Sequence, residues 1–533
     1  MFFIVLLLWL FIATKYVFFW LYLWQLKDYH IPRFLDHFNT EKGKRLIFNP
    51  LLVSKLAFLL LFFISRIAFT YALVLLYVVE SAFFLRSLLK KRSRMPQFTF
   101  KAIVLSAISV FVVALYPIVL SFYVKETQVY YKDLLIFDIL LPVVVSAIVL
   151  FFQPISVSLR NRILWQAKNK IKNFKNLTVI AITGSYGKTA TKEFLSTILA
   201  QKFNVLKTRD HQNSEIGIAT CILKDLKPGH EIFVVEMGAY AKGGIKLLAN
   251  MVNPKIGIVA GVNEQHLGLF GSMENLLSAE GGRELANSLA NNKGFIVLNG
   301  ENRHCLDLYR KVAFDKAVYA ESTSKVDADI WAEDVSVEKN GISFVVINKN
   351  KETAHFDVAV LGKQNVQNLL GATVVAQKLG MSLQEISKAC KKITQDQAGM
   401  TVKKGRHGIF VIDSSYSSNP DGVYADLNYL GVYENKKVIV MPCLIELGER
   451  SKEIHYKIGE QIAKICDAAI ITTKDKFQEI QKGAIDSGMS ANDIKFCENP
   501  QDIATMISLI CTENDTVLLE GRVPVSLIKT LSE

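Results

Sequence analysis

The first 153 residues differ from the rest of the chain in the length of their apolar runs. Long apolar runs cover 1–26, 102–124 and 134–152, each near the ~20 residues that a helix needs to cross a membrane. A further run lies within 51–85, which is long for one helix, short for a hairpin of two, and contains Arg66. We expect about four transmembrane spans in 1–153, namely 1–26, 56–85, 102–124 and 134–152. Asp138, inside the last span, is interpreted as an interfacial residue, with a polar path through the membrane as the alternative.

The pattern changes at 155–177, where apolar residues recur every four positions among basic ones. Leu159, Ile163, Ala167 and Ile171 form the stripe. This spacing predicts that the basic linker, 154–177, is an amphipathic helix lying on an anionic membrane surface. A solvated linker is the alternative.

From residue 178 onward, short apolar runs alternate with stretches of helical periodicity. Buried strands are expected at 178–183, 232–236, 256–259 and 295–298, with helices at 188–203 and 272–289. A strand-rich stretch, 328–361, precedes a helix near 365–378, and a second alternating series follows residue 394. Such alternation is typical of parallel sheets covered by helices. We therefore expect two α/β domains, 178–393 and 394–533.

Charge is divided along the same boundary. Residues 1–177 carry 22 Lys and Arg against 7 Asp and Glu, a net charge of +15, while the remainder is close to neutral at −2. The high overall charge therefore belongs to the membrane region, and we expect no nucleic-acid partner. The seven scattered cysteines include no C-x-x-C pair, which suits a reducing compartment.

Loop charge also orients the spans. The loop 86–101 has six basic residues and no acidic one, whereas 125–133 balances two lysines with two acids. By the positive-inside rule the first loop is cytoplasmic, the second external, and everything after residue 152 cytoplasmic. Four spans place the loop 27–50 outside, although it is moderately basic.

One local motif carries the strongest chemical signal. It reads T-G-S-Y-G-K-T from Thr183 to Thr189, between a predicted strand and a predicted helix. Glycines let the backbone approach phosphate groups, Lys188 can reach the terminal phosphates, and the Thr189 hydroxyl can ligate Mg²⁺. The motif departs from the general P-loop because residue 182 is Ile, but its placement favours nucleotide binding.

The chain resembles the Mur ligases, whose shortened loop has this form. Six further motifs follow in the order of that family: N-S-E-I-G from Asn213, E-M-G-A from Glu236, H-L-x-x-F-G-S from His266, G-K-Q-N-V-Q-N ending at Asn368, D-S-S-Y-S-S-N-P from Asp413, and E-L-G-E from Glu446. The closest branch is MurF. The resemblance implies a P-loop central domain, a Rossmann-like C-terminal domain, and ATP-dependent activation of a carboxylate, followed by amide formation with an amine such as D-alanyl-D-alanine.

The resemblance also assigns roles to residues of this chain. Lys188, Glu236 and His266 would be catalytic, and Thr189, Glu236, His266 and Glu280 would hold Mg²⁺. The nucleotide would be bound by Gly184, Ser185, Tyr186, Gly187, Lys188, Thr189, Asn365 and Asp413, and the substrate by Asn213, Tyr416 and Asn419. Structural alternatives are a solvated turn for Glu236, a structural histidine for His266, and a turn before Pro420 for Tyr416 and Asn419. His304 and His455 are expected to be surface or capping residues.

Three features depart from the family pattern. The lysine that usually follows H-L-x-x-F-G-S, and carries a carbamate, is missing. We hypothesise that Glu280 supplies the carboxylate instead. The expected G-R-[LM] reads Gly399-Met400, and the late K-G-S-R reads Glu520-Gly521-Arg522-Val523. Membrane helices also stand where a soluble MurF has its UDP-binding domain.

These departures leave the substrate open. We expect a multi-pass protein of the bacterial plasma membrane whose acceptor is a muropeptide or another envelope precursor, presented in lipid-linked form at the membrane surface. The amine would come from a dipeptide or an amino acid, and membrane lipids would be partners. A poly-γ-glutamate-type or amidating ligase is one alternative, and a catalytically degenerate nucleotide-binding scaffold is another.

Overall fold

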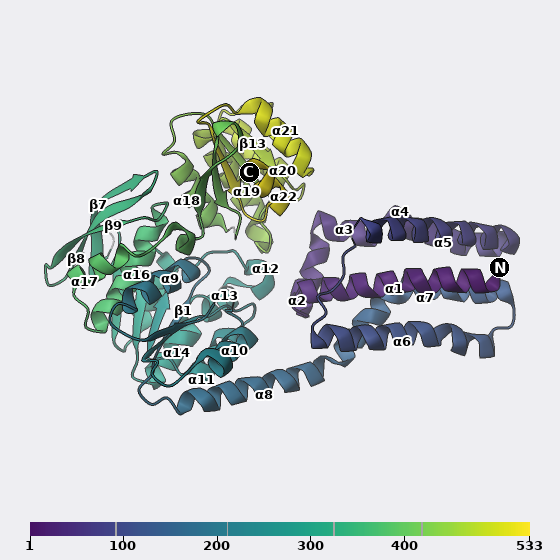
Figure 1. The fold of residues 1–533 in the computed structure, drawn as a ribbon, viewed down its shortest axis with the longest axis horizontal. Coiled ribbons are helices and arrows are strands. Elements are labelled where there is room, and N and C mark those ends of the chain that lie inside the picture. The colour runs from purple at the N-terminus through teal and green to yellow at the C-terminus, as the bar shows by residue number, and fades with distance from the viewer. Residues whose placement is uncertain (91–92, 210–211, 323–325, 417–418, 533) are drawn as a thin grey trace. The chain divides into compact units, whose positions relative to one another are not determined.

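The computed structural model describes residues 1–533 except 91–92, 210–211, 323–325, 417–418 and 533. It divides into two compact units, Met1–Arg160 and Asn161–Glu533 (Figure 1). The first is helical, and the second contains two sheets that are largely parallel. The predicted fold class, a helical region followed by two α/β domains, is confirmed.

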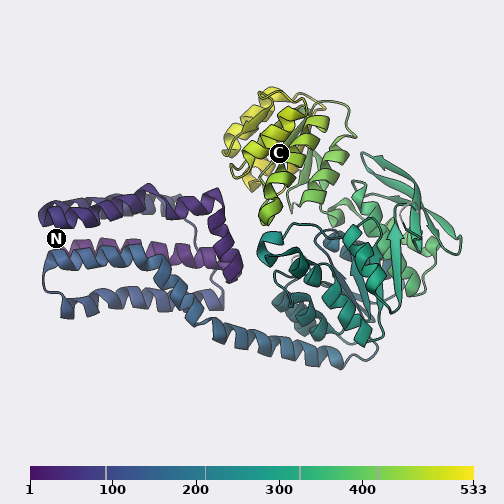
Figure 2. The ribbon, with the colours of Figure 1, turned by 180° about the vertical axis from the view of Figure 1, so that it is seen from behind.

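The first unit is a helical bundle. Its elements are α1 (Phe2–Leu26), α2 (Ile31–Asp36), α3 (Glu41–Ile47), α4 (Pro50–Ile64), α5 (Arg66–Leu89), α6 (Phe100–Tyr123) and α7 (Thr127–Phe151). Helix α1 lies in the middle of the bundle in both ribbon views and packs against α5, α6 and α7 (Figure 2). Two tryptophans of α1 join it to α7: Trp9 Nε1 donates to the Leu134 carbonyl at 3.0 Å, and Trp24 Nε1 donates to Ser146 Oγ at 3.0 Å.

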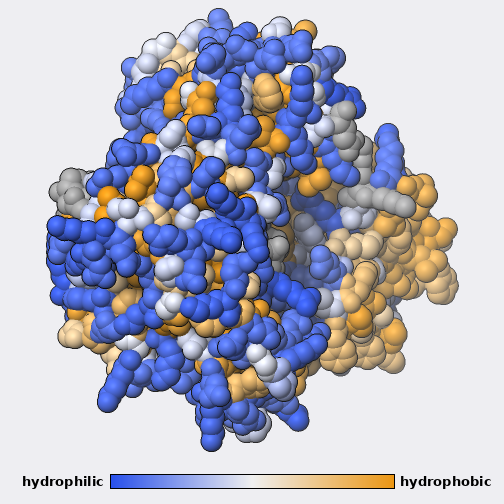
Figure 3. All heavy atoms as spheres, turned by 60° about the vertical axis from the view of Figure 1, so that its left-hand side comes forward, coloured by the Kyte–Doolittle hydropathy of each residue, from blue (hydrophilic) through white to orange (hydrophobic). Residues whose placement is uncertain are grey.

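Five helical segments of the described chain are long and apolar enough to cross a membrane. They are Phe2–Leu26, Glu41–Ile64, Arg66–Leu89, Phe100–Tyr123 and Thr127–Lys172. The exposed side chains of the first unit are largely hydrophobic, whereas those of the second are mostly hydrophilic (Figure 3). An apolar outer surface of this kind is what a bilayer stabilises.

The single span expected at 56–85 is wrong, because the chain breaks at Ser65. Ser65 is extended (φ −152°, ψ 110°), and its side chain accepts a hydrogen bond from the Ala68 amide, which starts a new helix. Upstream, the Asn49 side chain caps α4 and Pro50 occupies its first turn. Two helices of opposite direction therefore replace one span.

The extra helix changes which loops share an end of the bundle. Gln25, near the end of α1, exchanges two hydrogen bonds with the backbone of Gln97, and Gln153 Nε2 donates to the Tyr29 carbonyl. The segments 27–50 and 86–101 and the start of α8 (Gln153–Lys172) thus lie at one end. Both basic loops therefore lie at the same end of the bundle, whereas four spans would separate 27–50 from 86–101; the side of the membrane that each faces stays a prediction.

Asp138 is not an interfacial residue. Its carboxylate is buried in the bundle, 2.7 Å from Lys55 Nζ of α4. Lys55 Nζ also lies 3.3 Å from Glu80 of α5. The bundle therefore contains an ion-pair network that crosses several helices, as buried charges in an apolar medium require.

Helix α8 forms where the amphipathic stretch was predicted, and the C-terminal part of its apolar stripe packs against the middle domain. Leu164, Ala167 and Ile171 are buried in an apolar cluster with residues of the middle domain. Lys170 Nζ donates to the Leu223 carbonyl at 2.9 Å. Ala167 and Ile171 of the predicted stripe therefore pack against the middle domain, whereas Leu159 is 53% exposed, and a membrane-surface role stays a prediction.

The middle domain is built on a nine-stranded sheet of order β2-β3-β1-β4-β5-β6-β7-β8-β9, parallel as far as β7 and antiparallel beyond it. Its elements are β1 (Thr178–Thr183), α9 (Lys188–Leu199), β2 (Val205–Lys207), α10 (Glu215–Asp225), β3 (Ile232–Glu236), α11 (Gly244–Val252), β4 (Ile256–Val259), α12 (Leu267–Phe270), α13 (Met273–Ala279), α14 (Arg283–Asn291), β5 (Phe295–Asn299), α15 (Arg303–Lys311), β6 (Lys316–Ala320), β7 (Ile330–Glu338), β8 (Gly341–Asn348), β9 (Thr353–Val358), α16 (Gln364–Lys378) and α17 (Leu383–Cys390). Ile180 and Ile182 of β1 belong to the apolar cluster on one face, and Val179 and Ala181 to the cluster on the other. Burial on both faces explains why these strands are continuously apolar.

The C-terminal domain has a six-stranded sheet of order β10-β11-β15-β12-β13-β14, in which only β10 is antiparallel to its neighbour among the described strands. Its elements are β10 (Thr401–Lys404), β11 (Phe410–Ser414), α18 (Pro420–Leu430), β12 (Lys437–Met441), α19 (Ser451–Ile465), β13 (Ala468–Ile471), α20 (Phe477–Asp486), β14 (Ile494–Phe496), α21 (Pro500–Ile510), β15 (Thr516–Glu520) and α22 (Val525–Ser532). The carboxyl ends of parallel strands share one edge of a sheet, where α/β proteins bind ligands.

Candidate functional site

The glycine-rich loop lies between β1 and α9, as the sequence predicted. Gly184 (φ 137°) and Gly187 (φ 75°) adopt backbone conformations that side chains rarely allow. A Cβ on Gly184 would lie only 2.7 Å from the Gly261 carbonyl oxygen. Lys188 Nζ donates to the carbonyls of Gly184 (2.6 Å) and Ser185 (3.1 Å). The loop and the start of α9 therefore form a compact turn with a cation folded over it, a geometry suited to phosphate.

A first group of polar side chains surrounds Glu236 at the end of β3. Thr189 Oγ1 donates to Glu236 Oε2 at 3.0 Å, and Asn213 Nδ2 donates to Glu236 Oε1 at 3.1 Å. Glu236 is buried, so the solvated-turn alternative does not apply. The strand β3 thus places a carboxylate beside the hydroxyl that follows the loop lysine.

Sequence reasoning missed Lys192 in this group. Lys192 is fully buried, and its Nζ lies 3.1 Å from Glu193 Oε1 and 3.6 Å from Glu236 Oε2. It lies four residues after Lys188 on α9, and this helical spacing was the available signal.

A second group connects Glu280 to the loop. Glu280 Oε2 accepts a hydrogen bond from Ser185 Oγ at 2.9 Å, and Glu280 Oε1 lies 2.8 Å from His266 Nδ1. Burial raises the pKa of Glu280, but His266, Lys188 and Ser185 outweigh that effect and lower the pKa below its ordinary value. The structure therefore holds an ionised carboxylate next to the phosphate loop.

The C-terminal domain reaches this second group through the E-L-G-E segment. Glu446 Oε2 lies 3.9 Å from His266 Nε2, and the Gly268 amide donates to the Glu446 carbonyl at 2.8 Å. Glu446 has a positive φ of 68°, which a non-glycine residue adopts at a cost. The two domains therefore meet at the H-L-x-x-F-G-S segment.

His455 lies next to the E-L-G-E segment and is not a surface residue. It is fully buried; its Nε2 accepts from the Leu444 amide at 2.9 Å, and its Nδ1 lies 2.6 Å from the Ser451 carbonyl. Burial lowers the pKa of His455 to about 4. The ring is therefore neutral and donates from Nδ1.

Asn263 makes a second contact between the domains and was also missed from the sequence. Its Nδ2 donates to Asn419 Oδ1 (2.9 Å) and to Asp421 Oδ2 (2.7 Å). Burial raises the pKa of Asp421, although the bond from Asn263 opposes the shift. The sequence did offer a signal for Asn263: it is a polar residue shortly after the predicted strand 256–259, where parallel strands end at a ligand-binding edge. Asn419 also caps α18 by accepting from the Gly422 amide at 3.1 Å, as the turn alternative anticipated.

Among the described residues, neither Asn365 nor Asp413 forms a hydrogen bond with the glycine-rich loop. Asn365 is buried, and its Nδ2 donates to the Leu361 carbonyl at 2.8 Å. It is linked to α9 through Asn368, which donates to Asn365 Oδ1 at 3.0 Å and accepts from Thr191 Oγ1 at 3.3 Å. Asp413, at the end of β11, accepts from the Ser415 amide at 3.1 Å. Their nucleotide-binding roles stay predictions.

Tyr416 and Tyr186 differ in exposure. Tyr416 is 48% exposed on the segment after β11, and the neighbouring positions 417–418 of its motif lie outside the described residues. Tyr186, within the loop, accepts from Asn302 Nδ2 at 3.2 Å, and its ring would lie 2.2 Å from a Cβ on Gly261. Gly261 therefore makes room for the loop tyrosine, whereas Tyr416 is partly exposed and its substrate-binding role stays a prediction.

The predicted metal-binding side chains are Thr189, Glu236, His266 and Glu280, and all four lie in the two groups described above. Among the described residues, no three His, Cys, Asp or Glu side chains gather in a group that could hold a metal ion by themselves. Two smaller pairs lie next to the loop instead. Thr189 donates a hydrogen bond to Glu236, and Glu280 faces His266 and accepts a hydrogen bond from Ser185. Hydroxyl and carboxylate groups are ligands that Mg²⁺ accepts together with phosphate oxygens.

Comparison with known families decides the classification. Residues 182–376 match the model described as Mur ligase middle domain, and residues 400–523 match the one described as Mur ligase, glutamate ligase domain. Together the two matches cover more than half of the chain. This chain belongs to the Mur ligase family. The resemblance predicted from the motifs is confirmed.

Several curated relatives of this Mur ligase are UDP-N-acetylmuramoyl-tripeptide–D-alanyl-D-alanine ligases. The UDP-N-acetylmuramoyl-tripeptide–D-alanyl-D-alanine ligase of Haemophilus influenzae is 28% identical over 291 residues, which are 54% of this chain and 62% of that protein. This Mur ligase therefore spans about three fifths of that relative's length.

Solved structures of MurF share the fold of this Mur ligase. MurF from Acinetobacter baumannii superposes with a TM-score of 0.63 at 22% identity, over 70% of this chain and 80% of that one. MurF from Thermotoga maritima, solved in complex with ADP, superposes with a TM-score of 0.59 at 23% identity, over 70% and 83%.

Proposed function

We propose that this protein is a MurF-type, ATP-dependent amide ligase of cell-wall peptide synthesis. The observation that carries the proposal is the arrangement around the phosphate loop. Glu236 and Glu280, two buried carboxylates, each bond to a hydroxyl of that loop motif, Thr189 and Ser185, on either side of Lys188. Phosphoryl transfer depends mainly on positioning and charge neutralisation, and this site offers both.

The proposed reaction has two steps. A carboxylate oxygen of the acceptor attacks the γ-phosphorus of ATP, the bond to ADP breaks, and an acyl phosphate forms. An amine nitrogen then attacks the acyl carbon, the carbon–oxygen bond to phosphate breaks, and an amide, phosphate and a proton are released. Lys188 would bind the terminal phosphates and neutralise the charge that moves onto ADP.

Magnesium is the metal that the family implies, and the residues present fit it. Thr189 and Glu236 would hold one ion, and His266 and Glu280 a second, because each pair offers donors close to the loop. When bound, Mg²⁺ would neutralise phosphate charge. Glu280 would then supply the carboxylate that a carbamylated lysine supplies elsewhere in the family.

The helical unit would hold the enzyme at the bacterial plasma membrane with its catalytic domains in the cytoplasm. Five apolar helices and two basic loops at the end of the bundle where α8 begins support this orientation. The acceptor would be a muropeptide or other envelope precursor presented at the membrane surface in lipid-linked form, and the amine would be a dipeptide such as D-alanyl-D-alanine.

Phosphate release by the detergent-solubilised full-length protein tests the proposal. Soluble UDP-muropeptide and lipid-linked muropeptide would each be combined with D-alanyl-D-alanine, glutamate or ammonia, in the presence of ATP and Mg²⁺. Release that requires D-alanyl-D-alanine and an acceptor supports a MurF-type ligase. Release that requires glutamate or ammonia instead would identify another Mur-like ligase, and ATP binding without release for any pair would favour a scaffold.

A further inference from the structure

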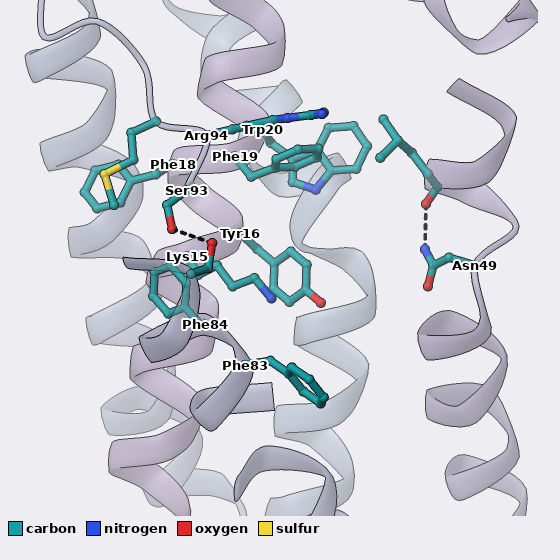
Figure 4. Close-up of a pocket in the computed structure, with 13 residues that line it drawn as sticks. Lys15, Tyr16, Phe18, Phe19, Trp20, Asn49, Phe83, Phe84, Ser93 and Arg94 are labelled. Carbon is teal, nitrogen blue, oxygen red and sulfur yellow. Dashed lines mark hydrogen bonds between the residues drawn. The ribbon is translucent and has the colours of Figure 1, made fainter. Parts of the chain in front are cut away.

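A cavity lies in the helical unit, next to the basic loop 86–101. Its volume is about 400 Å³, and it is lined by α1, by the end of α5, by residues 93–95, and by Leu46 and Asn49 (Figure 4). Aromatic side chains form much of its wall: Phe18, Phe19 and Trp20 from α1, and Phe83 and Phe84 from α5. Phe83 is also 66% exposed, so the cavity wall continues onto the apolar outer surface of the bundle.

Hydrogen-bond donors face this cavity. Lys15 is 29% exposed at its side chain, and its Nζ lies 4.9 Å from the ring centre of Tyr16 and 5.7 Å from that of Phe84. Arg94 is exposed at the loop side, and Ser93 Oγ donates to Ser87 Oγ at 3.1 Å. Two cations and a hydroxyl pair thus line a cavity whose other walls are largely aromatic, with Leu46, Asn49 and Met95 completing the lining.

The carboxylates beneath the cavity are already neutralised. Glu80 Oε1 accepts from Tyr16 Oη at 2.6 Å and lies 3.6 Å from Lys15 Nζ, while Glu80 Oε2 lies 3.3 Å from Lys55 Nζ. Lys55 also pairs with Asp138. Two lysines therefore balance two carboxylates in the buried network, and Arg94 adds a positive charge at the cavity mouth.

We propose that this cavity binds one lipid through a phosphate or diphosphate headgroup. Lys15, Arg94 and the Ser87–Ser93 hydroxyls would bind the headgroup, since cations next to a membrane surface attract anionic lipids. The lipid chain would leave over Phe83 onto the apolar surface. Trp20 and Tyr16 of the lining are of the two residue types that are enriched at the boundary between headgroups and hydrocarbon. The buried network positions Lys15. The proposal does not rest on ligase activity.

Native mass spectrometry of the full-length protein in detergent tests the proposal with four probes. They are phosphatidylglycerol, a polyprenyl diphosphate, diacylglycerol and inorganic diphosphate. We expect one bound phosphatidylglycerol or polyprenyl diphosphate per protein, and the tighter of the two identifies the source of the headgroup. Equal binding of diacylglycerol would overturn the proposal, because that lipid has no phosphate. Equal binding of inorganic diphosphate would overturn it too, because no lipid chain is then needed.

Single substitutions then locate the site. Arg94→Gln and Lys15→Gln should each weaken binding of the phospholipid about fivefold, which corresponds to about 1 kcal/mol per cation. Lys90→Gln, which removes an exposed charge from the same basic segment but does not line the cavity, is the matched control. Arg94 has no part in the buried network, so its substitution should not disturb folding. Unchanged binding in Arg94→Gln, or equal loss in the control, would overturn the proposal.

Ligase turnover on a soluble acceptor separates this inference from the proposed function. Arg94→Gln should bind lipid more weakly yet retain that turnover, since the residue lies in the helical unit. If the wild-type protein binds lipid but shows no ligase turnover, the proposed function is contradicted and the lipid site is not.

Discussion

The Ser185 hydroxyl donates a hydrogen bond of 2.9 Å to the buried carboxylate of Glu280, 95 positions later in the chain. This bond joins the phosphate loop to the end of α13, and the other oxygen of Glu280 faces His266. A negative charge is therefore fixed beside the loop without any chemical modification. The contact supports the hypothesis that Glu280 takes the place of the carbamylated lysine.

Glu280→Gln should keep the shape of this side chain and remove its charge. We expect turnover to fall about 10–100-fold, the usual range for a lost group around a metal, and the Mg²⁺ concentration for half-maximal rate to rise. Glu274→Gln, an exposed change on the same helix, is the control. Phosphate release measured across a Mg²⁺ series checks both effects. Unchanged Mg²⁺ dependence and turnover would refute the role of Glu280.

Lys188→Ala should abolish nucleotide-dependent turnover. The Lys188 ammonium is held over the loop by the Gly184 and Ser185 carbonyls, so its loss removes the cation closest to the expected phosphates. We expect at least a 100-fold fall in phosphate release. Lys242→Ala, an exposed lysine on the same domain, should leave the rate unchanged. Equal rates in both variants would show that the loop does not carry the reaction.

The buried pair Lys55–Asp138 should be needed for the stability of the bundle. Asp138→Leu leaves the Lys55 ammonium without one of its two carboxylates, and Lys55→Met leaves Asp138 without its cation and Glu80 with Lys15 alone. Each single change should destabilise the protein by about 3–5 kcal/mol, whereas the double variant should recover part of the loss. Thermal unfolding in detergent measures this. Additive losses in the double variant would contradict the pairing.

Five spans and four spans predict opposite sides for the N-terminus. With five, the N-terminus lies across the membrane from the catalytic domains, and the loop 27–50 lies on their side. All seven native cysteines lie beyond residue 220, and Cys497 is the partly exposed one. A cysteine placed at Phe3 or at Lys44, in a Cys497→Ser background, can be labelled in intact cells by a membrane-impermeant maleimide. We expect labelling at position 3 and protection at 44; the reverse pattern would restore four spans.

Stability near E-L-G-E should fall as the pH drops below about 6.5. The folded chain keeps His455 neutral down to a pKa of about 4, whereas in the unfolded chain this group takes up a proton near 6.5. The unfolded state therefore binds more protons between these values, and about 2 kcal/mol of local stability is lost at pH 5 relative to pH 7. Hydrogen exchange at the Leu444 amide, corrected for the intrinsic rate, measures the loss. His455→Gln should remove this pH dependence; equal dependence in the variant would assign it to another group.

The sequence predicted the second unit better than the first. Local rules predict strand β1, the loop and α9. The strand is an apolar run, the loop follows it with two glycines, and the helix begins directly after the second glycine. Motif order placed Glu236, Thr189, His266 and Glu280 at one site because the ends of parallel strands meet at one edge.

Contacts between distant segments were harder to predict. The Ser65 break depends on one extended residue inside an apolar run, which hydropathy does not detect. The position of Asp138 depends on Lys55, 83 residues away, and the stripe on α8 packs against an apolar cluster of the middle domain. Periodicity identifies a buried face, but it does not say what covers that face.

Mass analysis of the product tests the central claim most directly. The full-length protein would be reconstituted in vesicles with lipid-linked muropeptide, D-alanyl-D-alanine, ATP and Mg²⁺, beside the Lys188→Ala variant. The account predicts a lipid-linked product heavier than the acceptor by one dipeptide less one water, with one ADP and one phosphate for each amide formed, and none in the variant. ATP consumption without any amide product, or the same product from the variant, would contradict it.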